Sequence, residues 1–482
     1  MRCTAGLLRC ENLCRPSARA ATDRAAYNIT VSSFYVENFG CRATQADGAA
    51  IERQLRERGF TLIGAPQDAE LVILNTCTVT AAADHDVRAA IRRIHRQNPA
   101  CRILVTGCYA QRAPQEIAAI PGVSAVVGNS HKTQLAQIVC GDGTASRESR
   151  VASCEPGTLP AAMGNAEIYV SDIFAHTELT GAPVFETGAK TRPNLKVQDG
   201  CNNRCSFCII PAVRGRSRSL ELSEALREVQ GLVEAGYREV VISGINLGRW
   251  GRDLPGRQRF EHLVRAILED TSLEKLRISS VEPMDWSEEL IALVAGSPRI
   301  AKHAHVPMQS GSDRVLRQMH RKYRPWHYAD RLQRIRAAMP TAAIGADVMV
   351  GFPGETEQDF AATRLMVEQL PFTYLHVFTY SARPGTPAAQ MPQPVTPPVI
   401  KERNRILREL AAQKKLRFMQ SFLGQEITAI TLNEYHDSCT GTLTDNYLPL
   451  RIPGRLAPNQ WVTARVESVT AEGMAGTVTS NK

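Results

Sequence analysis

The chain has 482 residues, of which 43% are hydrophobic and 22% charged, a composition typical of folded globular proteins that excludes collagen, a coiled coil and wholesale disorder. No apolar run approaches the roughly 18 residues of a membrane span, so we expect no membrane association. Lys and Arg outnumber Asp and Glu by 57 to 48, and the net charge of +9 suits a polyanionic partner such as nucleic acid. The 13 cysteines are too sparse and irregular for a secreted disulfide scaffold. They favour metal or cluster ligation in a reducing compartment, and we expect a cytoplasmic protein.

Residues 1–27 are rich in arginine and contain no apolar core long enough for a secretory signal. Three interpretations stay open: a transit-like leader, a disordered extension, or a sequence read from an upstream start codon. Cys3, Cys10 and Cys14 lie in this segment, and we expect them to be non-functional.

Residues 28–141 alternate strand-like and helix-like segments, which is the pattern of a doubly wound parallel α/β domain. The expected strands are residues 29–36, 71–77, 101–108 and 123–128, and the expected helices are residues 47–59, 84–99 and 114–120. Clusters of Gly, Ser, Thr and Pro in residues 142–192 then predict a linker with one or two short strands.

Residues 193–418 repeat the alternation six times, and a basic helix at 400–418 ends the series. Six strand–helix units are too few for a closed eight-stranded barrel, so the pattern predicts a partial (β/α)6 barrel with an open side for a large substrate. In residues 419–482 the hydrophobic period becomes two. Five short strands separated by turn residues predict a small β-barrel at the C-terminus.

Three cysteines follow the first strand of the central barrel with the spacing Cys201-x-x-x-Cys205-x-x-Cys208. Three thiolates so close together can hold three irons of a 4Fe-4S cluster and leave the fourth iron open. A zinc site would need a fourth ligand, for which Asp199 and Asn203 are the nearby candidates. Three free thiols without a metal are the remaining alternative.

This loop at the carboxyl end of the first strand of a partial barrel resembles that of the radical S-adenosylmethionine enzymes. The resemblance implies that the open iron chelates the cofactor, and that an electron from the cluster cleaves it to a 5′-deoxyadenosyl radical. Cys201, Cys205 and Cys208 would then be both metal ligands and catalytic residues. Residues in the loop and near the ends of later strands would contact the cofactor, although glycine and serine at such places are often ordinary turn residues. These are Phe207, Gly244, Ser279, Ser280, Asp347 and Gly351.

Cys41, Cys77 and Cys108 form no local motif, but each follows one of the first three expected parallel strands. Because the carboxyl ends of parallel strands share one edge of the sheet, the three cysteines should converge there and could bind a second cluster. Three buried thiols are the alternative. Cys101 starts the strand that Cys108 ends, so it should lie roughly 20 Å away at the opposite edge. We expect ordinary buried thiols at Cys101, Cys140, Cys154 and Cys439.

Taken together, residues 29 to about 480 resemble the methylthiotransferases, and the C-terminal module resembles the RNA-binding TRAM domain. The matching stretches include NFGCRATQAD, LVILNTCTVT, LVTGCYAQ, VQDGCNNRCSFCIIPAVRGRSRS, RISSVEP, HVPMQSGSDRVLRQMHRKY, MVGFPGET and YSARPGTPAA. The resemblance implies two 4Fe-4S clusters and two S-adenosylmethionine molecules. One cofactor molecule supplies the methyl group to sulfur held at the Cys41/Cys77/Cys108 cluster, and the other supplies the radical that activates carbon 2 of an adenine.

Three features resemble the branch that acts on N6-threonylcarbamoyladenosine at position 37 of tRNA: Gln45, the run IIPAVRGRSRS and the run GINLGRWGRDL. The stretch NFGCRAT departs from the Leu-Gly-Cys-Lys-Val type usual in that branch. The same chemistry on N6-isopentenyladenosine or on a ribosomal-protein aspartate is the alternative, and an iron–sulfur RNA-binding redox sensor is the non-enzymatic one. The threonylcarbamoyl carboxylate calls for an arginine in the pocket. Candidates are Arg214, Arg216 and Arg218.

The implied partners are the tRNA anticodon loop, an electron donor such as flavodoxin or ferredoxin, and a sulfur donor. The basic helix and the net charge favour RNA because phosphate contacts dominate such affinity, and unstacked loop bases are the usual target of sequence-specific RNA recognition. His303 and His305 alternate on the fourth barrel strand, so both should point to the same side, in a catalytic or a core role.

Overall fold

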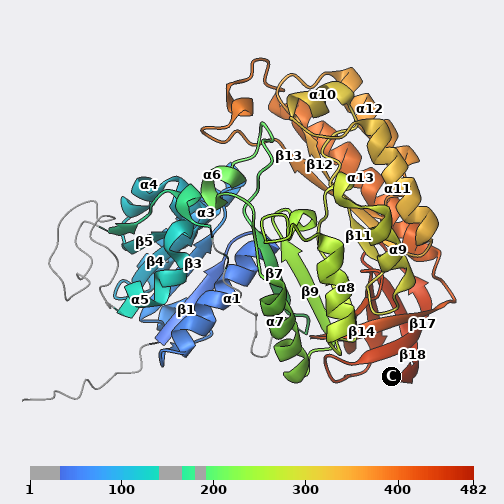
Figure 1. Cartoon of the computed structure of the whole chain (residues 1–482), viewed down its shortest axis with the longest axis horizontal. Helices are drawn as coiled ribbons and strands as arrows, with labels where there is room; N and C mark the ends of the chain where they lie inside the picture. The colour runs from blue at the N-terminus through green and yellow to red at the C-terminus, as the bar shows by residue number, and fades with distance from the viewer. Residues whose placement is uncertain (1–32, 141–165, 178, 180–190, 482) are drawn as a thin grey trace, which may run out of the picture.

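The computed structural model describes residues 33–140, 166–177, 179 and 191–481. An N-terminal α/β domain lies beside a central partial barrel, and a small β-barrel closes the chain (Figure 1). The expectations for residues 1–27, with Cys3, Cys10 and Cys14, and for Cys154 concern residues outside these ranges. Within the described part of the chain, no helix is both long and apolar enough to cross a membrane.

The N-terminal domain is built on a six-stranded, wholly parallel sheet in the order β2-β1-β3-β4-β5-β6. Separate apolar clusters cover its two faces, which confirms the doubly wound arrangement. The chain runs from β1 outward to β2 and then crosses back to β3, so the winding reverses between β1 and β3. The strands are β1 (Ser33–Asn38), β2 (Thr61–Leu62), β3 (Leu71–Thr76), β4 (Arg102–Gly107), β5 (Val123–Gly128) and β6 (Glu167–Tyr169).

Two features of this domain differ from the sequence-based expectation. The sequence indicated no strand at β2, which is only two residues long, and β6, a short strand of the kind expected within residues 142–192, pairs with β5 and so belongs to this domain. The first helix starts at Arg42, directly after Cys41, instead of at residue 47. The helices are α1 (Arg42–Arg56), α2 (Ala81–Gln97), α3 (Cys108–Arg112), α4 (Pro114–Ala118) and α5 (Leu135–Cys140), with the 3-10 turns η1 (Pro66–Asp68), η2 (Asn129–Gln134) and η4 (Ile173–Ala175).

The central domain contains the six expected parallel strands and one short antiparallel strand, β8. They form two sheets, β10-β9-β7-β8 and β11-β12-β13, joined by a bridge between Leu276 and Ile300. The sheets therefore form a partial barrel, as predicted. The strands are β7 (Asn194–Asp199), β8 (Arg218–Ser219), β9 (Glu239–Gly244), β10 (Lys275–Ile278), β11 (His303–His305), β12 (Ala343–Val350) and β13 (Tyr374–Thr379).

Helices cover the outside of the barrel and bury one large apolar core against its strands. The last of them carries the expected basic stretch but packs on β13 and α12, and Arg403 on it is buried against Glu355 and Glu357. The helices are α6 (Ile210–Arg214), α7 (Leu222–Glu234), α8 (Phe260–Asp270), α9 (Glu288–Gly296), α10 (Asp313–Gln318), α11 (Pro325–Ala338), α12 (Glu357–Gln369) and α13 (Pro397–Gln420), with η5 (Leu247–Arg249), η6 (Pro283–Asp285) and η7 (Pro387–Gln390).

The C-terminal strands close into a five-stranded barrel in the order β14-β15-β16-β18-β17, as predicted. It contacts the central domain through its β15–β16 turn, where the carbonyls of Thr444 and Asp445 accept hydrogen bonds from buried Arg277. Arg277 also pairs with buried Glu239 at 2.6 Å. The strands are β14 (Glu426–His436), β15 (Cys439–Thr444), β16 (Pro449–Pro453), β17 (Trp461–Val469) and β18 (Met474–Asn481).

A buried cluster of five charges joins the N-terminal domain to the barrel. Asp47 of α1 accepts hydrogen bonds from Lys132 Nζ at 2.8 Å, from Arg214 Nη2 at 2.9 Å and from Lys196. Asp199 at the end of β7 pairs with the same Arg214 and Lys196. Burial by itself would raise the pKa of Asp47, but the three cations hold it well below its usual range. The Asp47 carboxylate is therefore ionised inside the domain interface.

Replacing Asp47 with Asn should destabilise the protein strongly, because three buried cations would face Asp199 alone. Losing one partner of a buried ion pair costs about 3–5 kcal/mol, which corresponds to a fall in Tm of roughly 6–20 °C. Thermal unfolding followed by circular dichroism measures this. The control is Glu402→Gln, which breaks the exposed pair with Arg405 and should leave Tm unchanged. An unchanged Tm for Asp47→Asn would contradict the role given to this cluster.

Candidate active site

The cysteine loop of the barrel begins where β7 ends, and backbone geometry fixes its first residue. Gly200 has φ +69°, and a Cβ there would lie 2.0 Å from the Arg216 carbonyl oxygen, so this position requires glycine. The N–H of Gly200 donates to Asp199 at 2.8 Å, and the N–H of Cys201 donates to the Gly215 carbonyl at 3.1 Å. The charge cluster that joins the domains thus also anchors this loop.

All three cysteines of the loop are free thiols that line the same cavity. Burial raises the pKa of Cys208 to about 12, so it is a neutral thiol until it meets a metal. Arg321 Nη1 lies 3.3 Å from Cys205 Sγ, and Asn246 Nδ2 lies 3.6 Å from Cys201 Sγ. Donors of this kind stabilise thiolates. The residues therefore fit the three-thiolate site of an open cluster.

The alternative of a zinc site finds no support among the described residues. Among the described residues, no group of three or more His, Cys, Asp or Glu side chains is close enough to hold one metal ion. Asp199, one of the two candidate fourth ligands, is engaged by Lys196 and Arg214. In an iron–sulfur cluster each thiolate binds a different iron, so the three sulfurs stand further apart than around a single ion.

Cys41, Cys77 and Cys108 lie at the carboxyl ends of β1, β3 and β4, at one edge of the N-terminal sheet. Cys41 is exposed and precedes α1, whereas Cys77 and Cys108 are buried. A Cβ on Gly40, the neighbour of Cys41, would lie 3.2 Å from Cys77 Sγ. Burial, followed by the charges of Cys108 and Cys41, raises the pKa of Cys77 to about 12. The topology thus brings the three predicted thiols together.

Arg214 acts electrostatically on the N-terminal cysteine set. Its side chain is 1% exposed and contacts the carboxylates of Asp47 and Asp199. Burial alone would lower its pKa, but the negative charges of Asp199, Cys108, Asp47 and Cys41 raise it well above the usual value. The cluster of three cations and two carboxylates carries one excess positive charge. That charge favours thiolates at the N-terminal edge.

One cavity of about 520 Å³ lies between the two cysteine sets. It is lined by the barrel cysteine loop, by Cys41 and Arg42 from the N-terminal domain, and by Tyr447 from the C-terminal barrel. Five of the expected cofactor contacts line it: Phe207, Gly244, Ser279, Ser280 and Asp347.

Gly351 is not among the residues that line this cavity. It has φ +79°, and a Cβ there would lie 2.5 Å from Ile400 of α13, so this glycine permits close helix packing. At Gly244, in contrast, the absent side chain leaves room for Gln198, whose Oε1 accepts the Asn246 N–H at 2.7 Å. Gly244 therefore helps to place a residue that contacts Cys201.

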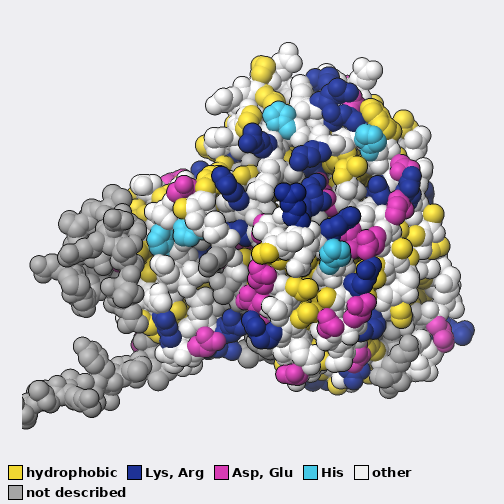
Figure 2. Space-filling view, in the orientation of Figure 1, with side chains coloured by type: hydrophobic (Ala, Val, Ile, Leu, Met, Phe, Trp, Pro, Cys, Tyr) yellow, Lys and Arg dark blue, Asp and Glu magenta, His cyan; other side chains and the backbone are white. Residues whose placement is uncertain are grey.

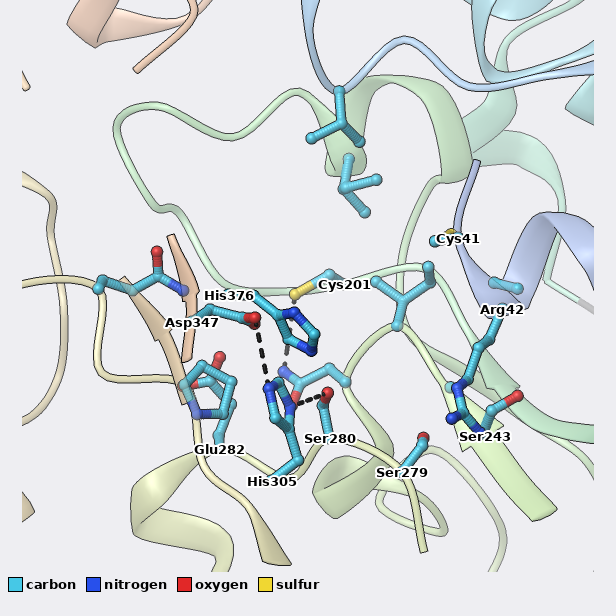
Figure 3. Close-up of a pocket in the computed structure, with 18 of the residues that line it drawn as sticks. Cys41, Arg42, Cys201, Ser243, Ser279, Ser280, Glu282, His305, Asp347 and His376 are labelled. Atoms are coloured by element: carbon cyan, nitrogen blue, oxygen red, sulfur yellow. Dashed lines mark hydrogen bonds and ion pairs between the residues drawn. The ribbon is translucent and has the colours of Figure 1, made fainter. Parts of the chain in front are cut away.

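Histidine and tyrosine rings form one wall of the cavity. Figure 3 shows His305 between Ser280 and Asp347: its Nδ1 lies 2.5 Å from Ser280 Oγ, and its Nε2 lies 3.4 Å from the Asp347 carboxylate. His303 stacks on Tyr374 with a ring separation of 6.0 Å. Burial, with the charge of Arg277, holds the pKa of His303 well below its usual value, so its ring is neutral. Both histidines face the cavity, as their alternation predicted.

The three arginines proposed for the pocket do not line it. Arg214 is committed to the charge cluster, Arg218 is buried and donates to the Arg214 carbonyl, and Arg216 is exposed. The arginines that line the cavity are Arg42, Arg277 and Arg321.

Sequence reasoning also missed Asn246 and Glu282, although both stand in loops just after strand ends, which is a signal for ligand contact. Arg321 follows α10 instead, and only the folded chain brings it to Cys205. Arg42 and Tyr447 belong to other domains, so no pattern within the barrel sequence could indicate them.

Of the cysteines expected to be ordinary buried thiols, Cys101 is buried in an apolar cluster at the start of β4, as predicted. Cys439 is partly buried at the start of β15. Cys140 is exposed at the end of α5, so the expectation of burial is wrong there because this short helix ends at the surface.

Two family models match the chain. The Radical SAM superfamily matches residues 195–367, and the Uncharacterized protein family UPF0004 matches residues 33–128. The threonylcarbamoyladenosine tRNA methylthiotransferase MtaB of Bacillus subtilis is 37% identical over 86% of this chain and 89% of its own length. The MtaB of Aquifex aeolicus is 34% identical over 87% of this chain and 96% of its own length. The tRNA-2-methylthio-N(6)-dimethylallyladenosine synthase of Acidothermus cellulolyticus is 34% identical over 86% of this chain and 79% of its own length.

Among solved structures, the radical S-adenosylmethionine methyltransferase TsrM of Kitasatospora setae has a TM-score of 0.53 at 16% identity and covers 75% of each chain. This likeness shows the fold alone. The relatives above and the matching family model establish that the chain belongs to the radical S-adenosylmethionine methylthiotransferases that act on tRNA.

Proposed function

We propose that the protein inserts a methylthio group at carbon 2 of N6-threonylcarbamoyladenosine at position 37 of tRNA. The observation that carries this proposal is the shared cavity, because an adenine held there would have the barrel cysteine loop on one side and Cys41 on the other. Such an arrangement suits a reaction that joins a radical step to sulfur delivery.

The barrel residues would provide the first half of this chemistry. Cys201, Cys205 and Cys208 would hold one 4Fe-4S cluster, and Ser279, Ser280 and Asp347 would line the site of the cofactor. When bound, the two clusters and S-adenosylmethionine would supply the radical, the sulfur and the methyl group. Arg321 and Asn246 would donate to the thiolates of Cys205 and Cys201, and the buried walls would keep water from the radical.

Cys41, Cys77 and Cys108 would hold the second 4Fe-4S cluster. Of the three, only Cys41 lines the cavity, while Cys77 and Cys108 are buried behind it. A cluster bound there would have one side toward the substrate. The excess positive charge around Arg214 would offset part of the cost of keeping three thiolates together.

The aromatic wall suits a flipped-out nucleobase. Tyr374, His303 and Tyr447 present flat rings to the cavity, and unstacked RNA bases stack on such rings. Figure 2 shows Lys and Arg side chains gathered on the upper part of the face of the molecule in view, in the region between α6 and α10 of Figure 1. These side chains could contact RNA phosphates. The TRAM-like barrel would add RNA contacts at the cavity rim.

The charge of the cavity favours threonylcarbamoyl over dimethylallyl as the N6 substituent. Sequence identity alone does not distinguish these two substrates, because relatives named for each of them share about a third of their residues with this chain. Arg277 and Arg321 already pair with Glu239 and Glu282, so an apolar dimethylallyl group would leave Arg42 of the lining without an anionic partner among the described residues, whereas a carboxylate would supply one. A cytoplasmic location, a flavodoxin or ferredoxin as electron donor, and a separate sulfur donor complete the proposal.

Two cysteine variants should separate the two halves of the reaction. Cys205→Ala should lower the iron content by about four atoms per chain and abolish cleavage of S-adenosylmethionine to 5′-deoxyadenosine. Cys77→Ala should keep that cleavage but yield no methylthiolated RNA. Iron analysis and liquid chromatography of the anaerobically reconstituted full chain measure both quantities. Cys140→Ser, at an exposed thiol outside both sets, serves as the control. Methylthiolation by Cys77→Ala at the wild-type level would refute the second cluster.

Nucleosides from tRNA of cells with and without the gene test the substrate. We expect 2-methylthio-N6-threonylcarbamoyladenosine to disappear on deletion and N6-threonylcarbamoyladenosine to accumulate, as measured by mass spectrometry. Expression of the wild-type gene should restore the product, and expression of Cys205→Ala should not. If the dimethylallyl analogue vanished instead, the chemistry would stand and the substrate assignment would fall.

A further inference from the structure

Arg42 is the one cationic side chain of the cavity lining that forms no ion pair with another described residue. Arg277 is bound by Glu239 and by carbonyls, and Arg321 pairs with Glu282. The partly buried Arg42 has no carboxylate partner in the described chain, and it lines the cavity. A guanidinium in such a place is a ready binding site for an anionic group of a ligand.

Arg42 is also held in place from two sides. Its Nη2 donates to the Tyr447 hydroxyl at 3.0 Å, and its backbone carbonyl accepts from Asn194 Nδ2 at 2.9 Å. Tyr447 is itself fixed, because its ring lies 4.7 Å from that of His303 and 5.4 Å from the Arg277 guanidinium. One N–H of Arg42 donates to Tyr447, and the other four donate to no described residue, so a ligand could accept from them.

The position of Arg42 in the chain places it near the reacting edge of the base. It follows Cys41 directly, and both residues line the cavity (Figure 3). In adenine, carbon 2 and carbon 6 flank N1 on one edge of the ring, and carbon 6 carries the N6 nitrogen. A residue beside the site of sulfur delivery is therefore within reach of the N6 substituent.

We infer that Arg42 binds the carboxylate of the threonylcarbamoyl group and thereby determines which modified adenosine is accepted. This inference rests on the proposed function for its substrate. A planar guanidinium forms two parallel hydrogen bonds to a carboxylate, a geometry that a neutral N6 substituent cannot satisfy. Tyr447 is a positioning residue, because it orients Arg42 from the C-terminal barrel.

The test measures RNA binding to the full-length protein by fluorescence anisotropy. Two anticodon stem-loops are compared, one with N6-threonylcarbamoyladenosine and one in which the threonyl carboxylate is replaced by a carboxamide. The wild type should bind the carboxylate RNA roughly 10- to 100-fold more tightly, because hydrogen bonds between charged groups contribute that much. Arg42→Gln should bind both RNAs with the affinity that the wild type shows for the carboxamide.

Further variants separate this role from a structural one. Arg42→Lys keeps the positive charge but cannot form two parallel hydrogen bonds to a carboxylate, so it should retain part of the discrimination between the two RNAs. Tyr447→Phe should reduce this discrimination less than Arg42→Gln does. Arg216→Gln, at an exposed arginine outside the cavity, should leave the discrimination at its wild-type value. Iron and sulfide content of each variant shows whether the neighbouring Cys41 site is intact. In turnover, Arg42→Gln should raise KM for the carboxylate RNA more than it lowers kcat.

The outcomes separate this inference from the proposed function. If Arg42→Gln keeps the wild-type ratio of affinities, or if the wild type does not discriminate, Arg42 is not the carboxylate site. That result would overturn the inference even if the wild type methylthiolates the carboxylate RNA. Conversely, discrimination that depends on Arg42 without methylthiolation of that RNA would support the binding site and refute the proposed reaction.

Discussion

The buried ion cluster of Asp47, Asp199, Lys132, Lys196 and Arg214 is the constraint on which the site depends. It joins helix α1, which starts beside Cys41, to strand β7, which ends at the barrel cysteine loop. The relative position of the two cysteine sets is therefore fixed by charges that burial makes costly to separate. A looser apolar interface would hold the domains together but would not set this geometry as narrowly, because apolar contact has no direction.

The same cluster has an electrostatic consequence for the N-terminal set of thiols. Three cations face two carboxylates, and the excess charge lies on the side of Cys41 and Cys108. Burial makes the Cys77 thiol resist ionisation, so gathering the three cysteines as thiolates around one cluster costs free energy. A fixed positive charge nearby lowers that cost in the folded protein before any metal arrives. The charged interface thus stabilises the fold and also favours the thiolate form of the N-terminal cysteines.

Much of the fold could be predicted from the sequence because it depends on local patterns. The six barrel strands and the five C-terminal strands showed their periods of hydrophobicity, and the convergence of Cys41, Cys77 and Cys108 followed from the parallel topology alone. The two-residue strand β2 could not be predicted, since two residues carry no period, and a short strand was expected near β6 but its place in the N-terminal sheet was not. Their pairing is decided by the sheet that they extend.

The candidate site was predictable only within one domain at a time. The three expected arginines lie close in sequence to the barrel cysteines, but Arg214 and Arg218 donate to a buried carboxylate and a backbone carbonyl, and Arg216 is exposed outside the cavity. Arg42 and Tyr447 come from opposite ends of the chain, 405 residues apart, and only the assembled domains bring them within 3.0 Å. An arginine that is already paired with a carboxylate binds a ligand weakly, because its charge is neutralised and its N–H donors are used. The functional guanidinium in such a cavity is therefore the one that the fold leaves unpaired, and pairing becomes visible only when the domains are in place.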